Sequence, residues 1–171
     1  MKTEDITVVI TSFKSKQKIF TCLNSVGLHT KVIVIENSND KKLKKQIETD
    51  YPNLECFLSE ENLGYAKGNN LALSKVKTKY ALILNPDATL EKNAINNFLL
   101  RVNDLKDFAI IAPMIQTDKD NNFQENDISL KQVNSVKGFA MFLNLKEFEN
   151  VGFFDRNFFI YFEEIDLCKR L

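Results

Sequence analysis

The sequence predicts an α/β fold built on a mostly parallel sheet with helices on both faces. Segments rich in valine and isoleucine alternate with segments of helical periodicity through the first two thirds of the chain. This alternation is typical of parallel strands joined by right-handed helical crossovers. Residues 81–84 are all apolar, without alternation, as expected for a strand that helices bury on both sides. We expect this strand at the centre of the sheet.

Three pairs of strand and helix are predicted before the central strand. Residues 6–10 are rich in β-branched side chains, and residues 31–35 form a second run of the same kind, followed by a polar segment that can cap a helix. Residues 54–58 alternate as a third, shorter strand. The three helices are expected around the following positions: Ile19, Leu23 and Val26; Leu43 and Ile47; Ala66, Asn70, Leu71 and Leu73.

The last part of the chain departs from this alternation. A helix after Asp87, with Ala94, Ile95, Phe98, Leu99 and Val102 on one face, is followed by a short apolar strand at residues 109–113. Residues 117–126 are polar and predict a loop. Residues 133–143 look like a strand around a glycine, with no clear helix before it. The sheet is therefore expected to turn antiparallel here.

Composition excludes several classes of function. The 171 residues suit a single domain, and the 23 basic residues equal the 23 acidic ones, so nothing favours nucleic acid as a partner. No apolar run approaches the ~20 residues of a membrane span, and the amino terminus lacks the apolar region of a signal peptide, so we expect a cytosolic protein. The three cysteines lie among apolar neighbours and predict buried thiols. A single histidine excludes catalytic triads and zinc sites built on several histidines.

Acidic residues follow the predicted strands at three places: residues 36–40, Asp87, and residues 163–166. Ligands bind at the carboxyl ends of strands in open α/β sheets, and carboxylates gathered there suit magnesium or manganese holding substrate phosphates. The alternative is three solvated acidic loops, with Asp87 in an ordinary turn. The first loop lacks the glycines of a dinucleotide fingerprint, and no P-loop pattern occurs.

The acidic residues near the end of the chain follow a dense aromatic stretch. Glu163, Glu164 and Asp166 could simply begin a helix, where early acids favour the macrodipole. For the aromatic side chains we expect at least half to be plain core, and the stretch would also hold a carboxylate in a poorly hydrated pocket, which raises the pKa of a carboxylate and suits it to act as a base. The aromatic side chains are Phe158, Phe159, Tyr161 and Phe162.

The order of these segments resembles the family 2 glycosyltransferases of the GT-A fold, especially their bacterial rhamnosyltransferase-like branch. The most specific match is residues 62–70, similar to the family's Asn-x-Gly-x-Ala-x-Gly-x-Asn segment. Residues 84–87 look like its form of the Asp-x-Asp metal motif. The remaining matches are residues 6–13, 32–38, 138–143, 151–155 and 159–170. The resemblance implies a three-layer α/β/α sandwich, mostly parallel, with an antiparallel strand on the acceptor side.

The resemblance also implies an activity, namely inverting, metal-assisted transfer of a sugar from a nucleotide-diphosphate donor to a glycan or lipid-linked acceptor in surface polysaccharide synthesis. Asp87 would bind Mn²⁺ or Mg²⁺, and Glu164 would be the catalytic base, with Glu163 as the alternative and Asp166 in support. Lys67 would lie near the phosphates, and Asn85 near the ribose. The other substrate-binding residues implied are Thr11, Phe13, Glu36, Asn37, Asp40, Asn62, Gly64 and Asn70.

The chain departs from the family pattern at its end and at two motif positions. Glu36 stands in place of the customary Asp, Asn85 occupies the first place of the metal motif, and the chain stops at Leu171, within the helix that carries the base. We therefore expect one domain over residues 1–171, shortened at its carboxyl end. The competing function is a nucleotide-binding module without catalysis. The sequence leaves open the nucleotide base, the sugar, the acceptor, the oligomeric state and contact with the inner face of the membrane.

Overall fold

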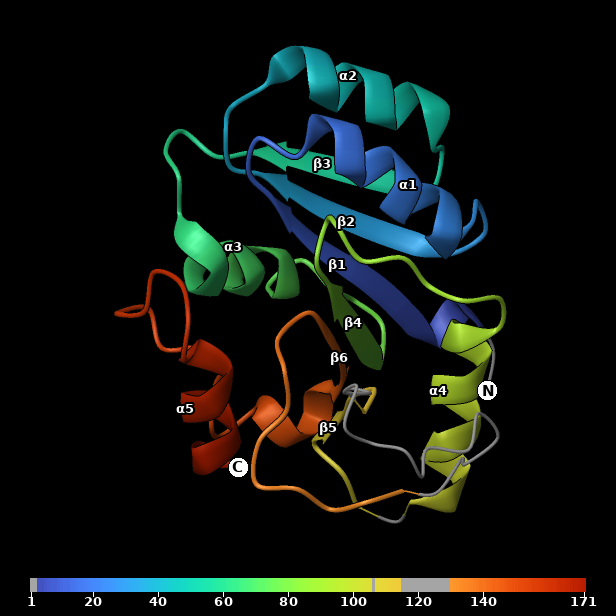
Figure 1. Cartoon of the computed structure of the whole chain (residues 1–171), viewed down its shortest axis with the longest axis vertical. Helices are drawn as coiled ribbons and strands as arrows, with labels where there is room; N and C mark the ends of the chain where they lie inside the picture. The colour runs from blue at the N-terminus through green and yellow to red at the C-terminus, as the bar shows by residue number, and fades with distance from the viewer. Residues whose placement is uncertain (1–2, 106, 115–129) are drawn as a thin grey trace, which may run out of the picture.

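The computed structural model describes residues 3–105, 107–114 and 130–171. Over these residues the chain forms a six-stranded sheet in the order β3-β2-β1-β4-β6-β5 (Figure 1). Strands β1 to β4 are parallel, whereas β6 runs antiparallel to both of its neighbours. The strands span Ile6–Ser12 (β1), Lys31–Glu36 (β2), Leu54–Leu58 (β3), Tyr80–Leu84 (β4), Ile110–Ile111 (β5) and Ala140–Asn144 (β6).

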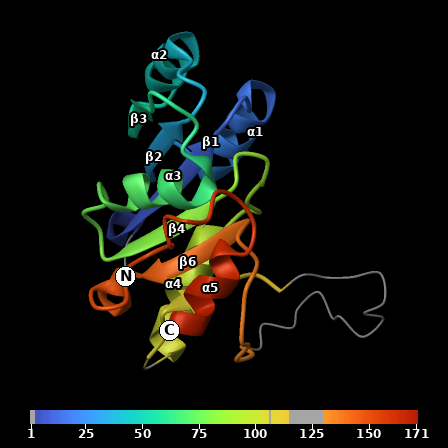
Figure 2. The same cartoon turned by 90° about the vertical axis from the view of Figure 1, so that its left-hand side faces the viewer.

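Helices cover both faces of the sheet, and side chains of alternate strand residues point to each face. Val8, Val34 and Leu82 belong to the core beneath α1, α2 and α4, whereas Val9 and Ile83 belong to the core beneath α3 and α5. In Figure 2, α3 and α5 lie on the side of the sheet that faces the viewer. The helices span Lys16–Val26 (α1), Lys41–Asp50 (α2), Gly64–Leu73 (α3), Ala94–Asp104 (α4) and Glu163–Arg170 (α5), with short 3-10 helices at Thr3–Asp5 (η1) and Leu145–Phe148 (η2).

The predicted fold class is confirmed, including the burial of the central strand. All five residues of β4 are buried, and β4 lies between β1 and β6. The predicted antiparallel strand is also confirmed, because β6 runs antiparallel to β4, with Leu84 opposite Ala140. This pairing brings the start of β6 to the carboxyl end of β4. The residues just after β4 and just before β6 therefore lie at the edge where the acidic strand ends were predicted.

Two predicted strands are shorter in the structure. The expected strand at residues 133–143 begins only at Ala140, because residues 133–135 are exposed and do not pair with a neighbouring strand. The strand expected at residues 109–113 contains only the two residues of β5. The predicted loop at 117–126 lies outside the described residues. Within the described part of the chain, no helix combines the length and the apolar composition that crossing a membrane requires.

The cysteine prediction holds for two of the three thiols. Cys22 and Cys56 are buried and free, and burial raises the pKa of each thiol to about 12. Cys168 is free as well but only partly buried. At neutral pH the two buried thiols are protonated and poorly nucleophilic, so they serve as small apolar core residues.

Candidate active site

The carboxyl ends of β1 and β2 lie side by side and are covered by α3. Ser12 pairs with Glu36 in the sheet register, and α3 packs so closely that a β-carbon added at Gly68 would lie 2.5 Å from Thr11 Cγ2 and 3.2 Å from Asn37 Nδ2. Only a glycine allows this approach of helix and strand. The glycine-bearing segment therefore sets the distance between α3 and the predicted nucleotide side of the site.

Glu36 is fully buried at the end of β2 and only half of its carboxylate is satisfied. Its Oε1 accepts hydrogen bonds from the Ser38 backbone N–H (2.7 Å) and the Ser38 hydroxyl. Its Oε2 has no hydrogen-bond partner among the described residues. A buried carboxylate oxygen without a donor is costly. Glu36 thus holds a buried acceptor atom without a donor, at the end of β2 where a substrate contact is predicted.

Asn37 and Asp40 hold the loop after β2 in place. The Asn37 Nδ2 donates to the Gly64 carbonyl (3.2 Å), and its Oδ1 accepts from the Ser59 hydroxyl (3.0 Å). Asp40 is the N-cap of α2, since its Oδ1 accepts from the backbone N–H of Lys42 and of Leu43, both at 2.9 Å. Both side chains therefore stabilise the fold, whether or not they also make the substrate contacts predicted for them.

Thr11, at the end of β1, and Phe13, just after it, are both predicted substrate contacts and differ in exposure. Thr11 donates from its hydroxyl to Asn69 Oδ1 (2.9 Å), which ties β1 to α3. The Phe13 side chain is 43% exposed, with the Lys14 ammonium 5.2 Å from its ring centroid. Phe13 presents an open aromatic face at the sheet edge, of the kind on which a planar base can stack.

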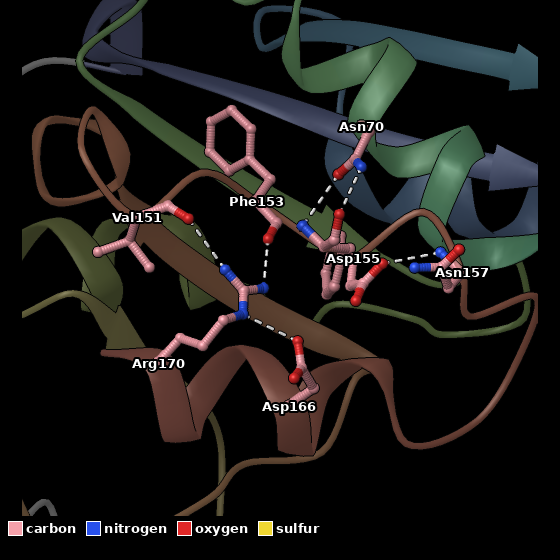
Figure 3. Close-up of polar contacts among 8 residues, drawn as sticks. Asn70, Val151, Phe153, Asp155, Asn157, Asp166 and Arg170 are labelled. Carbon is pink, nitrogen blue, oxygen red and sulfur yellow. Dashed lines mark hydrogen bonds and ion pairs between the residues drawn. The ribbon is translucent and has the colours of Figure 1, made fainter.

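The segment at residues 62–70 joins α3 to the last loop of the chain. The Asn62 Oδ1 accepts from the Gly64 N–H (3.1 Å). The Asn70 amide pairs with the backbone of Phe154, donating to its carbonyl at 2.8 Å and accepting from its N–H at 3.0 Å, as Figure 3 shows. Lys67 is exposed on α3. Of these residues, Lys67 presents an exposed charge, whereas Asn62 and Asn70 organise the backbone.

Asp87 follows β4 and is exposed, with 51% of its side chain accessible. Its Oδ2 lies 3.3 Å from the Lys18 Nζ of α1. Asn85, two residues earlier, donates its N–H to the Phe139 carbonyl at 2.8 Å and so connects the end of β4 to the segment before β6. These contacts hold the polypeptide turn at Asp87 directly beside the start of the antiparallel strand.

At the end of β4, Asp87 offers an accessible carboxylate for a divalent cation. Within residues 3–105, 107–114 and 130–171, no three His, Cys, Asp or Glu side chains gather closely enough to form a metal cluster. Mg²⁺ binds in such sites through one or two carboxylates together with substrate phosphates and water. The exposed, hard oxygen donor of Asp87 fits that pattern, whereas a cage made of protein ligands alone does not.

Glu163 and Glu164 begin α5 in different environments. The Glu163 residue is only 5% exposed, and its Oε2 has no partner among the described residues. Burial raises the pKa of the Glu163 carboxyl, and the charge of Glu164 raises it further. Glu164 is partly exposed. A β-carbon added at Gly138 would lie 3.9 Å from the Glu164 Cβ, so the two residues are neighbours. The two neighbouring acids are thus a buried one and an accessible one.

Tyr65 connects α3 to the segment before β6, close to these acids, a role that sequence reasoning missed. Its hydroxyl donates to the Gly138 carbonyl, just before β6. Burial raises the pKa of the Tyr65 hydroxyl, and the charges of Glu163 and Glu164 raise it further. Tyr65 occupies a variable place in the motif, so the pattern gave no signal for it. The contact holds Gly138 beside the acids.

Asp166 supports the site through Arg170. The Arg170 Nε lies 2.9 Å from Asp166 Oδ2, and the guanidinium also donates to the backbone carbonyls of Val151 (3.0 Å) and Phe153 (2.5 Å). Figure 3 shows these contacts joining α5 to the 151–158 loop. Asp166 therefore orients the arginine that holds this loop.

The expectation that at least half of the late aromatic residues form core is wrong. Phe158 packs against the core, whereas the side chains of Phe159, Tyr161 and Phe162 are more than half exposed. Tyr161 and Phe162 have positive φ angles of 72° and 70°. This left-handed backbone turns their side chains outward, although a carboxylate, Glu163, is buried beside them as predicted.

A pH-dependent stability is expected from Glu163. Because its folded-state pKa is raised, the folded chain binds this proton more tightly than the unfolded chain does, so its contribution to stability is lost as pH rises through the folded pKa. The melting temperature of Glu163→Gln relative to wild type should therefore increase from pH 4.5, the ordinary carboxyl value, towards neutral pH. The same substitution at the exposed Glu149 should show no such trend; a flat difference for Glu163→Gln would contradict the burial described here.

A model of a known protein family matches most of the sequence. The family model described as Glycosyl transferase family 2 matches residues 7–168, which is nearly the whole chain. The chain belongs to this family. The match includes β1 from Thr7 onward, the Asp87 turn and all three acids of α5, so the predicted resemblance is confirmed at the level of the family.

The curated relatives support the predicted branch. The chain is 25% identical to the low-salt glycan biosynthesis hexosyltransferase Agl10 of Haloferax volcanii, over 98% of this chain and 61% of the relative. It is 28% identical to the rhamnosyltransferase WbbL of Escherichia coli K12, over 91% of this chain and 71% of the relative. The chain thus spans about three fifths of the length of the first relative. The predicted resemblance to the rhamnosyltransferase-like branch is confirmed.

A solved structure supports the GT-A fold. The mannosyltransferase PcManGT of Pyrobaculum calidifontis, in complex with GDP-Man and Mn²⁺, superposes with a TM-score of 0.70 at 13% identity. The match covers 94% of this chain and 50% of that structure. At this identity the likeness concerns the fold, and the predicted GT-A architecture is confirmed.

Proposed function

We propose that this chain is an inverting, metal-assisted glycosyltransferase that moves a sugar from a nucleotide-diphosphate donor to a hydroxyl group of a glycan or lipid-linked acceptor. The observation that carries the proposal is a series of contacts that connects the turn carrying Asp87 to the segment beside Glu164. Asp87 follows β4, and Glu164 lies beside Gly138, whose neighbour Phe139 bonds to Asn85. A leaving group and an attacking hydroxyl could therefore be held at one place.

The donor would lie across the carboxyl ends of β1, β2 and β4. Thr11, Phe13, Glu36 and Asp40 are the candidates for the base and ribose, with the unsatisfied Glu36 Oε2 as an acceptor for a base or ribose donor group. Asn85 would contact the ribose. The phosphates would lie near Lys67, and the backbone around Asn62 and Gly64 would shape their binding. The GDP-Man bound to PcManGT supports a nucleotide sugar as the ligand class.

Asp87 would hold the divalent cation, Mn²⁺ or Mg²⁺. When bound, such a cation supplies positive charge where the diphosphate leaves. The Mn²⁺ in the PcManGT complex supports a divalent cation as part of the site. Lys18, which pairs with Asp87, would have to turn away or move to a phosphate oxygen when the donor binds. Its side chain is 66% exposed and has room to do so.

Glu164 would take the proton of the acceptor hydroxyl as that oxygen attacks the anomeric carbon on the side opposite the leaving group. A single displacement of this kind inverts the anomeric configuration. A base must reach the acceptor, and Glu164 is accessible whereas Glu163 is buried. Glu163 remains the alternative base, and Asp166 would keep its positioning role through Arg170.

The setting we propose is the synthesis of a surface polysaccharide, at the cytoplasmic side of the cell membrane. The names of the relatives, a glycan biosynthesis hexosyltransferase and a rhamnosyltransferase, support a hexose or deoxyhexose as the transferred group. The whole of residues 1–171 would act as one GT-A domain, because the same hydrophobic sheet supports both halves of the site.

The experiment that tests the activity is slow hydrolysis of the donor. Wild-type chain incubated with UDP-, dTDP-, GDP- or CDP-sugars should release nucleoside diphosphate only when Mn²⁺ or Mg²⁺ is present, and Asp87→Ala should lower that release at least about tenfold. Asp104→Ala is the matched control, since Asp104 is equally exposed (52%) and also ion-paired, but on α4.

The second candidate, a binding module without catalysis, draws on the Lys18–Asp87 ion pair, which occupies the metal-binding carboxylate in the structure. Nucleotide binding without any metal-dependent release would favour the module. Release that does not depend on metal or on Asp87 would contradict the metal assignment.

A further inference from the structure

The residues 159–162, here called the aromatic loop, expose four large apolar side chains in succession. Phe159 is 54% exposed, Ile160 51%, Tyr161 70% and Phe162 68%. Exposed apolar residues scattered singly need no explanation, but a contiguous group marks a binding surface. The loop ends where α5 begins with Glu163, so in the chain it directly precedes the acids of the candidate active site.

The loop is held outward by specific contacts. The Tyr65 N–H donates to the Phe159 carbonyl at 2.7 Å, which fixes the start of the loop against the first turn of α3. The preceding segment is fastened by the Asn70 pair with Phe154 and by Arg170 (Figure 3). On the other side the chain enters α5 directly. Exposure of these side chains is therefore a property of an anchored loop.

The backbone of the loop is strained at the two most exposed residues. Tyr161 and Phe162 both have positive φ, which a bulky L-residue adopts only at a cost. Two consecutive strained residues hold two aromatic rings in water, where neither the backbone nor the hydrophobic effect favours them. Strain of this kind that persists beside an active site indicates a binding function.

The charge around the loop decides which class of ligand fits it. Glu163, Glu164 and Asp166 follow within four residues, and of these only Asp166 is neutralised by an ion pair, with Arg170. Carboxylates beside the rings repel anionic lipid surfaces and nucleic acid. On the same face, the exposed Lys67 of α3 is assigned to the donor phosphates. The lysines of α2 lie on the other face of the sheet, because α2 and α5 pack on opposite cores.

We propose that the aromatic loop binds a neutral sugar ring of the acceptor, with Tyr161 and Phe162 as the stacking surface. The faces of aromatic rings are electron-rich, and the C–H-bearing face of a pyranose carries slight positive charge, so the two attract. The hydroxyl groups at the edge of the same ring can then donate to Glu164. The inference rests on the proposed function, and it assigns the part of the acceptor that carries the attacking hydroxyl.

The test uses methyl α-rhamnoside, β-glucoside, β-galactoside and N-acetyl-β-glucosaminide as probes, without donor. Saturation-transfer NMR should show contact between protein aromatic protons and the C–H face of at least one glycoside in wild type. The Tyr161→Asn/Phe162→Asn variant should weaken that binding at least about tenfold. Asparagine tolerates positive φ, so the variant should keep or raise the melting temperature. Leu100→Ala is the control, because Leu100 is 57% exposed on α4.

Three results would overturn the inference: glycoside binding that the double variant leaves unchanged, no saturation transfer to any glycoside in wild type, or a loop that instead drives co-sedimentation with phosphatidylglycerol vesicles or dimerisation. Failure of the proposed function would look different. In that case glycosides would bind through Tyr161 and Phe162, while nucleoside diphosphates and Mn²⁺ would fail to bind the same protein.

Discussion

Replacing Glu164 by Gln should lower kcat for sugar transfer by about 10²–10⁴-fold, the usual contribution of a general base. Glutamine keeps the size and polarity of the side chain but cannot accept the acceptor proton. Donor binding should be unchanged, because Glu164 is assigned to the acceptor side of the site. The measurement is steady-state transfer of a labelled sugar, together with the affinity for the donor.

The neighbouring acid provides the decisive comparison. Glu163→Gln should retain most of the transfer activity, since Glu163 is buried and its carboxylate faces the protein interior rather than solvent. Glu149→Gln, at an exposed glutamate outside the site, controls for the loss of a negative charge. Normal transfer by Glu164→Gln combined with lost transfer by Glu163→Gln would show that the base had been assigned to the wrong residue.

Replacing Gly64 by Ala should destabilise the fold by about 3 kcal/mol, close to the largest effects of single substitutions. Gly64 has φ +70°, and a β-carbon there would lie 2.3 Å from the Phe159 carbonyl oxygen and 2.7 Å from the Phe159 ring. The carbonyl belongs to the backbone that Tyr65 holds, so it cannot move aside without breaking that hydrogen bond. Urea denaturation measures the change in the free energy of unfolding.

A second glycine separates the two causes of this effect. Gly152 has a similar φ of +74°, but a β-carbon added there meets no atom within 4 Å. Gly152→Ala should therefore cost only the backbone strain, about 1–2 kcal/mol. Equal losses for the two variants would mean that the close approach of the aromatic loop to α3 does not exist in solution.

The strands and their polar ends could be predicted because each depends on local sequence. The apolar runs determine the strands, and a parallel sheet brings their carboxyl ends to one edge, so residue order alone is enough to predict Glu36 and Asp87 at the same edge of the sheet. Asp40 could be expected to cap α2 on the same local grounds, as it does.

The features that could not be predicted depend on contacts between distant segments. Lys18 and Asp87 are 69 residues apart, and their ion pair follows from how α1 crosses the end of β4. The different burial of Glu163 and Glu164 follows from the direction in which α5 leaves the aromatic loop. The outward turn of Tyr161 and Phe162 requires positive φ, which no residue type at those positions signals.

The metal-binding prediction depends partly on local sequence and partly on contacts between distant segments. Carboxylates were expected to gather at the sheet edge, and the chemistry of the residues was sufficient to suggest a hard cation. The described residues instead present Asp87 without a cluster of further acids. Sequence patterns reveal which strands end in acids, whereas the distances between those acids depend on loop paths set by tertiary packing.

The measurement that tests the central claim most directly is a calorimetric titration of wild-type chain with UDP, dTDP, GDP and CDP, each with and without Mn²⁺. The account predicts that at least one nucleoside diphosphate binds, and that Mn²⁺ strengthens its binding. A preference for one base would identify the donor. Absence of binding by all four, in protein that melts cooperatively, would contradict the nucleotide-sugar site at the carboxyl ends of β1, β2 and β4.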